Sequence, residues 1–361
     1  MVDWLAGKRV RGTSSERTPL GTVLGGTAVG GWVELGRTTL GAGADQLDVS
    51  SLPDKRYYMY LHWVIPDTYV APRLRLGNGS VDTGSNYATR RNENGGTDVT
   101  GTSQDHITIT PEGGANPQLI VGYIANRSAN EKLTLNHSVH RKTAGAANEP
   151  GRGEVVGKWT NTSNPLDVIR MYNGNAGSGD YASGSELVIL GWDPDDTHTN
   201  NFWEELASVN TTSGDNLSSG TFTAKKYLWV QMYMKYTSTG GTLHETFNND
   251  TGNNYASRDS YDGGTDGTST SFTHIDWDRG QQDTYWFINQ FIINNASNEK
   301  LCIGHQIRID NTHTGAGTAP HRSERVDKWA NTSNQITEID FDNTTAGIDI
   351  SNGWLKVWGA D

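Results

Sequence analysis

The strongest constraint on the fold of this chain is an internal repeat. Its 361 residues contain Asp82–Asp98, DTGSNYATRRNENGGTD, and later Asp250–Asp266, DTGNNYASRDSYDGGTD, with eleven of seventeen positions identical and no gap. Five further matches occur in the same order at separations of 168 to 171 residues: Trp32 with Trp203, Lys55 with Lys225, Asn130 with Asn298, Pro150 with Pro320, and Gly191 with Gly359. A period of this length is the size of a whole domain, not of a solenoid unit. The chain is therefore predicted to hold two copies of one domain.

The matches also set the domain boundaries. We place copy one at 32–193 and copy two at 203–361, with a short polar linker at 194–202. Residues 1–31 belong to neither copy and form an N-terminal arm.

Several segments of each copy alternate between apolar and polar residues, which is typical of strands with one buried face. In copy one, Leu133, Leu135, His137 and Val139 alternate with polar residues, and in copy two, Leu301, Ile303, His305, Ile307 and Ile309 do the same. Residues 228–235 alternate too, whereas 57–64 is aromatic throughout, so its inward face stays open. We expect the apolar side of each alternating segment to be the buried one.

The remaining pattern indicates an all-β protein. Residues 118–125 and 285–293 are nearly continuous apolar runs suited to central strands, and 187–190 and 355–358 would close the two copies. Gly- and Asn-rich loops separate these runs, and the only helical candidate is 3–11. We therefore predict two tandem, homologous, antiparallel β-sandwich domains, with a jelly-roll-like arrangement as the favoured subtype.

Charge and composition narrow the function classes. The net charge of −12 argues against a nucleic-acid-binding body, since phosphate contacts need clustered Lys and Arg. Cys302 is the only cysteine, so neither an internal disulfide nor a thiolate zinc site is expected. No apolar run approaches the roughly 20 residues that span a bilayer, and no secretory signal is apparent in the sequence given. We expect no membrane role and no cofactor, with calcium as the one possible exception.

That exception rests on oxygen-bearing side chains in the repeated DTG…GGTD segment. Candidates for calcium or glycan contact are Asp82, Asn86 and Asp98 in copy one, and Asp250, Asn254 and Asp266 in copy two. Calcium takes six to eight oxygen ligands. The alternative, which we favour, is ordinary turn chemistry, because Asp and Asn next to Gly commonly form turns.

Other candidate residues have structural alternatives of the same kind. His137 and His305 occupy equivalent positions and could act as ligands or as a pH switch, but a hydrogen-bonded core histidine is the favoured interpretation. Trp159 and Trp329 are favoured as buried anchors over sugar-stacking platforms. We find no Ser-His-Asp set, phosphate loop or HExxH helix, so no enzyme activity is expected.

The repeated segment resembles a group of phage and marine-virus proteins that carry a phrase like Phe-Asn-x-Asp-Thr-Gly-x-Asn-Tyr. Residues 247–255 match it closely, whereas copy one departs from it before Asp82. The closing segments 184–191 and 353–359 and the opening DWLAGKRVRGTSSERT are also similar to such proteins. The resemblance implies a virion structural role, as a capsid, decoration or tail-appendage subunit, and supplies no catalytic residues.

Our first hypothesis is a structural protein of the virion that forms homo-oligomers and contacts other virion proteins. Its N-terminal arm would anchor to a neighbouring subunit through Trp4, Lys8, Arg9, Arg11 and Arg17. The alternative is a carbohydrate- or host-receptor-binding protein, which requires exposed aromatic platforms at equivalent sites in both copies and would contact host-surface glycans. A polysaccharide hydrolase is the least favoured hypothesis, since no repeated carboxylate pair stands out.

Overall fold

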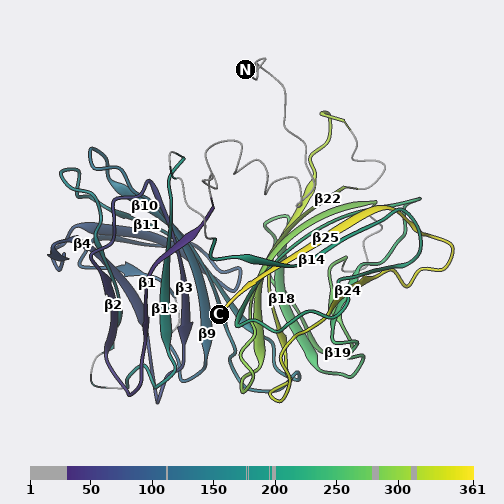
Figure 1. The fold of residues 1–361 in the computed structure, drawn as a ribbon, viewed down its shortest axis with the longest axis horizontal. Coiled ribbons are helices and arrows are strands. Elements are labelled where there is room, and N and C mark those ends of the chain that lie inside the picture. Colours follow the sequence, from purple (N-terminus) through teal and green to yellow (C-terminus); the bar gives the residue numbers. More distant parts are fainter. Residues whose placement is uncertain are drawn as a thin grey trace, which may run out of the picture.

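A computed structural model describes residues 31–361, except 111–112, 176, 178, 195, 197–200, 279–283 and 310–314. The described residues form strands and no helix, in two sandwiches that lie side by side (Figure 1). This confirms the predicted all-β, tandem-sandwich fold. The arm residues and the helical candidate at 3–11 lie outside the described residues.

Copy one consists of an eight-stranded sheet and a five-stranded sheet. In spatial order the larger sheet contains β1 (Val33–Thr39), β13 (Glu186–Trp192), β3 (Tyr57–Val64), β9 (Gln118–Ala125), β10 (Lys132–His140), β11 (Gly151–Trp159), β6 (Tyr87–Glu93) and β7 (Val99–Gln104). The smaller sheet contains β2 (Gln46–Ser50), β12 (Val168–Asn173), β4 (Pro72–Asn78) and β5 (Ser80–Val81), with β8 (Ile107–Thr108) beside β4.

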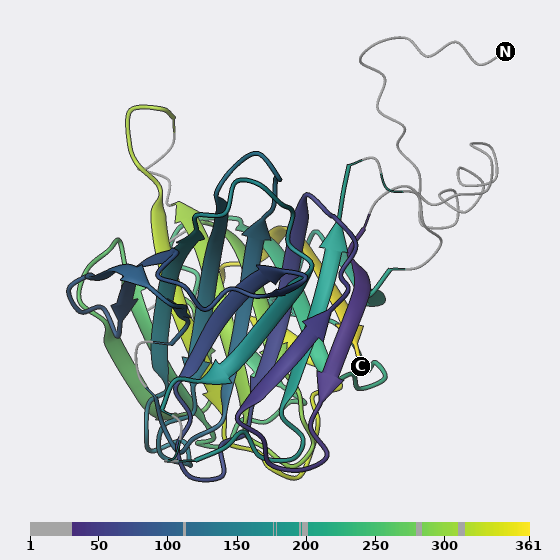
Figure 2. The ribbon, with the colours of Figure 1, turned by 90° about the vertical axis from the view of Figure 1, so that its left-hand side faces the viewer.

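Copy two repeats this topology. Its eight-stranded sheet contains β14 (Glu204–Thr211), β25 (Ile350–Ala360), β16 (Tyr227–Tyr236), β21 (Tyr285–Ile293), β22 (Lys300–Ile309), β23 (His321–Trp329), β18 (Tyr255–Tyr261) and β19 (Gly267–Phe272). Its four-stranded sheet contains β15 (Asn216–Ser218), β24 (Ile339–Asp342), β17 (His244–Phe247) and β20 (Ile275–Asp276). Figure 2 shows the strands of copy one in front of those of copy two.

The strand registers of the two copies coincide residue by residue. Tyr57 of β3 lies opposite Ala125 of β9, as Tyr227 of β16 lies opposite Ile293 of β21. Leu133 of β10 lies opposite the same Ala125, as Leu301 of β22 lies opposite Ile293. These pairings define which residues are equivalent in the two copies.

Each sandwich has its own apolar core between its two sheets. In β16 the alternating residues Leu228, Val230, Met232 and Met234 point into the core of copy two, as expected. In β3 the open question is resolved, because both faces of the strand are buried from Tyr58 onward. Tyr58, Tyr60 and Val64 join the core of copy one, whereas Met59, Leu61 and Trp63 belong to a separate cluster that spans both copies.

The expected burial of the apolar side is wrong for Leu133 and Leu135 of β10, whereas Leu301 and Ile303 of β22 are buried as expected, although outside their own sandwich. The polar residues Lys132, Thr134, Asn136 and Ser138 point into the copy-one sandwich and are buried, while Leu133 and Leu135 point outward. Likewise, Cys302 belongs to the core of copy two, and Leu301 and Ile303 lie in the cluster shared by the copies.

Internal hydrogen bonds make these inward polar residues tolerable, since a buried polar group is costly only when it is left unpaired. The Lys132 ammonium donates to the carbonyls of Asn130, Asn161 and Asn164 at 2.6 to 3.2 Å. The Asn136 amide donates to the carbonyl of Val155 at 3.0 Å. The apolar side of each strand is thereby left to face out of its own sandwich.

One buried carboxyl group in copy two yields a stability prediction. Glu245 occupies the place of Leu74 in copy one, is fully buried, and accepts hydrogen bonds from Trp277 and Gln290. Burial raises its pKa from 4.5 to about 8. The folded state therefore binds more protons than the unfolded chain between these values, so stability falls as pH rises from about 5 to 8.

We expect Glu245→Gln to remove this loss and to stabilise the protein at pH 8 by on the order of a few kcal/mol. Urea unfolding at pH 5 and pH 8 measures it. The exposed Glu204→Gln serves as control. Equal pH dependence in wild type and Glu245→Gln would contradict the prediction.

Candidate functional site

The eight-stranded sheets of the two copies pack against each other through their outward faces. Their shared apolar cluster takes Met59, Leu61, Trp63, Leu119, Val121, Val139, Val188 and Leu190 from copy one, and Trp203, Tyr227, Phe291, Ile293, Leu301, Ile303, Val326 and Ala360 from copy two. We call this contact the junction. It buries the outward apolar face that a single sandwich cannot cover.

Polar contacts border the junction. Arg152 of copy one pairs with Asp266 of copy two at 2.7 Å, and both side chains are almost fully buried. Glu186 accepts hydrogen bonds from the Lys226 ammonium and the Tyr227 hydroxyl, each at 2.8 Å. These contacts fix the relative position of the two sheets.

A second set of polar contacts involves the loop after β10. The Lys328 ammonium donates to the carbonyls of Arg141 and Thr143, and Glu299 accepts from the Gly145 amide. A loop of copy one thus covers a Lys–Glu pair of copy two.

The junction is asymmetric, because each copy contributes a different part of the same face. Copy two contributes Tyr227, Leu301, Ile303 and Val326, whose equivalents in copy one are Tyr57, Leu133, Leu135 and Val156. None of these four copy-one equivalents belongs to the junction. Instead, all four are exposed, with Leu133 at 56 % and Val156 at 45 %. A contact between unlike surfaces of two like units is heterologous.

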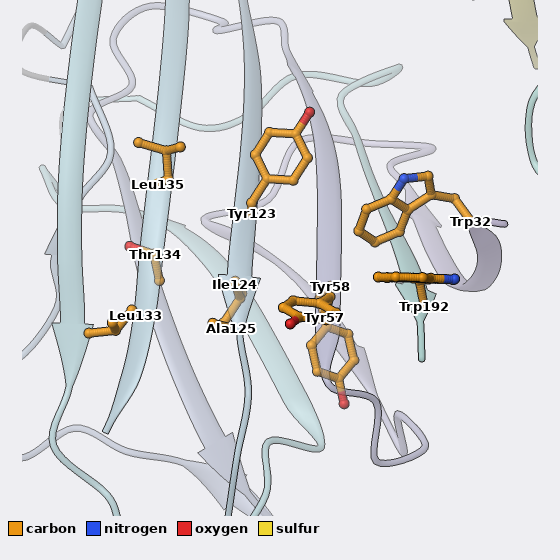
Figure 3. Close-up of a pocket in the computed structure, with 10 residues that line it drawn as sticks. All are labelled: Trp32, Tyr57, Tyr58, Tyr123, Ile124, Ala125, Leu133, Thr134, Leu135 and Trp192. Carbon is orange, nitrogen blue, oxygen red and sulfur yellow. The ribbon is translucent and has the colours of Figure 1, made fainter. Parts of the chain in front are cut away.

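The exposed Tyr57, Leu133, Leu135 and Val156 form the copy-one patch together with the half-buried Trp32, Tyr123 and Trp192, of which Trp32 and Tyr123 also pack against the edge of the junction. Most of them line a pocket of ≈ 360 Å³. Tyr57 stacks on Trp192 with ring centroids 5.4 Å apart. Figure 3 shows these two rings and Trp32 on one side of the pocket and Leu133 and Leu135 on the other.

Copy two, in turn, exposes the equivalents of residues that copy one buries in the junction. Leu119 and Val139 are buried in the junction, but their equivalents Phe287 and Ile307 are 37 % and 44 % exposed. Phe287 and Ile307 border a second pocket, and Tyr233 stacks on Trp354 beside them. We define the copy-two patch as Tyr233, Phe287, Ile307 and Trp354. Six of the nine exposed large apolar side chains of the described chain therefore belong to these two patches.

Charged residues follow the same pattern. The buried Lys328–Glu299 pair of the junction has an exposed counterpart in Lys158–Glu131, where the Lys158 side chain is 43 % exposed and Nζ lies 2.9 Å from the carboxylate. Each copy thus carries the same ion pair, but only copy two has it covered.

The predicted calcium or glycan residues lie in two separate places. Asp82 accepts hydrogen bonds from the indole of Trp159, the amide of Gly84 and the side chain of Asn86. Copy two repeats this arrangement with Asp250, Trp329, Gly252 and Asn254. These hydrogen bonds hold the pKa values of Asp82 and Asp250 below the ordinary value, although burial opposes them. The carboxylates act here as acceptors that close a turn over a buried Trp.

Asp98 and Asp266 lie at the other end of the same hairpins. Asp98 pairs with Arg90 at 3.3 Å in an exposed position, whereas Asp266 is buried against Arg152 in the junction. The structure therefore does not bring Asp98 to Asp82, or Asp266 to Asp250. Trp159 and Trp329 are 1 % exposed, which confirms their prediction as buried anchors.

His137 and His305 are not core histidines. They project from the outward faces of β10 and β22 and meet in the junction, with ring centroids 4.5 Å apart. Sequence analysis missed this because each histidine stands alone in its own copy. Alternation alone does not tell which face of a strand is inward, so the sequence carries no signal for this contact.

Among the described residues, no helix is long and apolar enough to cross a membrane. No protein-family model matches the chain, and no curated protein does. Two solved structures align with most of it. Domains LG4–5 of the mouse laminin α1 chain share 12 % identity, with 91 % of this chain and 88 % of that chain covered and a TM-score of 0.19. The T=3 Penaeus vannamei nodavirus shares 9 % identity, with 99 % and 95 % covered and a TM-score of 0.15. Alignments at such scores carry no argument about this chain.

The two equivalent lysines give a matched test of the junction. Lys328 is fully buried, so Lys328→Ala should cost about 3 kcal/mol by leaving Glu299 charged and unpaired. Lys158→Ala removes the same ion pair in an exposed setting and should cost less than about 0.5 kcal/mol. Urea unfolding of dilute protein compares them. Equal losses in the two variants would show that copy one does not cover Lys328.

Proposed function

We propose that this protein is a structural subunit that assembles by repeating its own junction between molecules. The copy-one patch of one molecule would pack on the copy-two patch of the next. The observation that carries the proposal is that each patch is equivalent to a surface already buried in the junction. The junction thus supplies a template for the contact.

Physical chemistry favours burial of both patches. Exposed apolar groups scattered singly are normal, but contiguous apolar patches mark interaction surfaces. Each buried apolar side chain contributes roughly 1.5–3 kcal/mol relative to exposure. Charges support the pairing too, because Arg152 and Asp266 of the junction have exposed equivalents in Arg322 and Asp98.

The direction of assembly follows from the asymmetry of the junction. A heterologous contact leaves one free patch at each end of every oligomer, so it either closes into a ring or grows into a filament. A symmetric dimer, in which each molecule uses the same patch twice, is not what this arrangement predicts.

We place this subunit in a virus particle, as a capsid, decoration or tail-appendage protein. The resemblance of residues 247–255 to phage and marine-virus proteins supports that setting, and repeated self-association suits it. The N-terminal arm, with Trp4, Lys8, Arg9, Arg11 and Arg17, would add a second contact to a neighbouring subunit.

Carbohydrate binding is the second candidate, and the aromatic pocket of copy one favours it. The Tyr57–Trp192 stack offers a platform for a sugar ring. However, Trp192 is replaced by Ala360 in copy two, where Tyr227 is buried, so the platform is not duplicated. The lining also contains no charged or amide side chain. Protein packing therefore fits this pocket better than a polar sugar.

Complementary blocked variants test the proposed assembly. Val156→Glu blocks the copy-one patch and Ile307→Glu blocks the copy-two patch, so each variant alone should be monomeric. Mixed together they should form a 1:1 dimer and nothing larger, because each retains the patch that the other lacks. Sedimentation velocity with one variant fluorescently labelled measures this.

Tyr69→Glu is the matched control, since Tyr69 is 36 % exposed and belongs to neither patch. It should assemble like wild type. A wild-type protein that stays monomeric at high concentration, with and without residues 1–31, would overturn the proposal. If the protein assembles only after residues 1–31 are deleted, those residues cover one of the two patches in the intact chain. Binding on a glycan array that Tyr57→Ala abolishes, without any assembly, would favour the carbohydrate candidate.

A further inference from the structure

We propose that His137, Glu154 and His305 form a binding site for a divalent transition-metal ion, of the zinc type, that clamps the two copies together. His137 and Glu154 belong to copy one and His305 to copy two. The site lies within the junction and is independent of contacts between molecules.

The strand registers create the cluster. His137 of β10 lies directly opposite Glu154 of β11. Packing of the two sheets then brings His305 of β22 edge-on to His137, with an interplanar angle of 74°. One ligand atom from each of the three residues lies within 4.8 Å of the other two. Two imidazoles and one carboxylate are the donor set of many zinc sites.

The imidazoles lack other partners. Among the described residues, the ring nitrogens of His137 and His305 make no hydrogen bond. Burial lowers the pKa of His137 to about 4 and that of His305 to about 3, so both rings are neutral near pH 7. A neutral imidazole presents the lone pair that a metal ion requires.

The carboxylate is already oriented by its neighbours. Arg152 Nη1 donates to Oε1 of Glu154, and the same guanidinium bonds to Asp266. This arrangement leaves the second oxygen of Glu154 as the ligand atom. In many metal sites, the carboxylate that binds the metal is itself held in place by a hydrogen bond from a neighbouring residue.

The local charge suits a cation despite the nearby arginines. The charged groups around the histidines are Arg152, Arg322, Glu154, Glu324 and Asp266. These two positive and three negative groups leave one net negative charge beside the histidines. Glu324 lies opposite His305 in register, as Glu154 lies opposite His137. Its two carboxylate oxygens contact Arg322 and Arg152, so it offsets the charge of both arginines beside the site.

A modest contraction completes the site. Ligand atoms around a tetrahedral Zn²⁺, each about 2.0–2.1 Å from the metal, are about 3.3 Å apart. The three atoms here must therefore approach one another by up to about 1.5 Å, which side-chain rotation can provide. Imidazole and carboxylate donors suit Zn²⁺, Co²⁺ and Ni²⁺ better than Ca²⁺.

Cobalt titration of the full-length protein tests the site. Co²⁺ reports its own ligand field through visible absorption, so no activity assay is required. We expect one Co²⁺ per chain with a tetrahedral spectrum, displaced by Zn²⁺. His305→Gln and Glu154→Gln should each bind about 100-fold more weakly, since loss of even an outer-shell partner costs 10–100-fold. Zn²⁺ should also raise the thermal midpoint of the wild type but not of His305→Gln.

His244→Gln is the matched control, because His244 lies in the other His-containing cluster of the described chain, with Asp276 and Asp278. It should leave the 1:1 signal intact. Absence of Co²⁺ binding by folded wild type, or binding that survives His305→Gln and is lost in His244→Gln, would overturn the proposal. The titration is made at concentrations where the protein is monomeric, so its result is separate from the test of assembly.

Discussion

The structure depends on the burial of apolar faces that point away from the sandwich to which they belong. Leu133, Leu135, Leu301 and Ile303 stand on the outer surfaces of the two large sheets, while their polar neighbours occupy the interior. The hydrophobic effect is proportional to apolar area removed from water, whichever domain removes it. A single sandwich of this kind would leave its most apolar strands in solvent. The second copy therefore stabilises the first by burying apolar surface that a single sandwich leaves exposed.

Packing the two outward apolar faces against each other does not have to bury the whole of either face. In the junction, copy one uses the part of its face around Trp63 and Leu119, whereas copy two uses the part around Tyr227 and Leu301. Each copy therefore retains an uncovered part that is equivalent to a covered part of the other. Interfaces between like units that use unlike surfaces either close into a ring or extend into a filament. The same geometry that stabilises the monomer thus provides the basis for the proposed assembly and brings His137 to His305.

Much of the fold could be predicted from the sequence, because the repeat and the period-two alternation are local signals. The all-β class and the central positions of β9 and β21 follow from them. Alternation cannot say which face is inward when polar residues can be paired inside, as Lys132 and Asn136 are. Which face is inward depends on hydrogen-bond partners distant in sequence. Tyr60 bonds to Asn136, and the carbonyl of Asn164 accepts from Lys132. The junction and the His137–Glu154–His305 cluster require the docking of two sheets, which no single segment encodes. The hydrogen-bonded turns at Asp82 and Asp250 follow from a local pattern, an Asp placed close to a Gly.

The most direct test of the account is a charge exchange between molecules. In the junction, Arg152 pairs with Asp266, so assembly predicts that Arg322 of one molecule pairs with Asp98 of the next, and both are exposed in the monomer. Sedimentation velocity of Arg322→Asp and of Asp98→Arg should show weakened assembly, and a chain carrying both substitutions should recover it, because the charges again match across the contact. The account would be contradicted if the double variant assembled no better than the weaker single variant, or if neither substitution changed assembly at all.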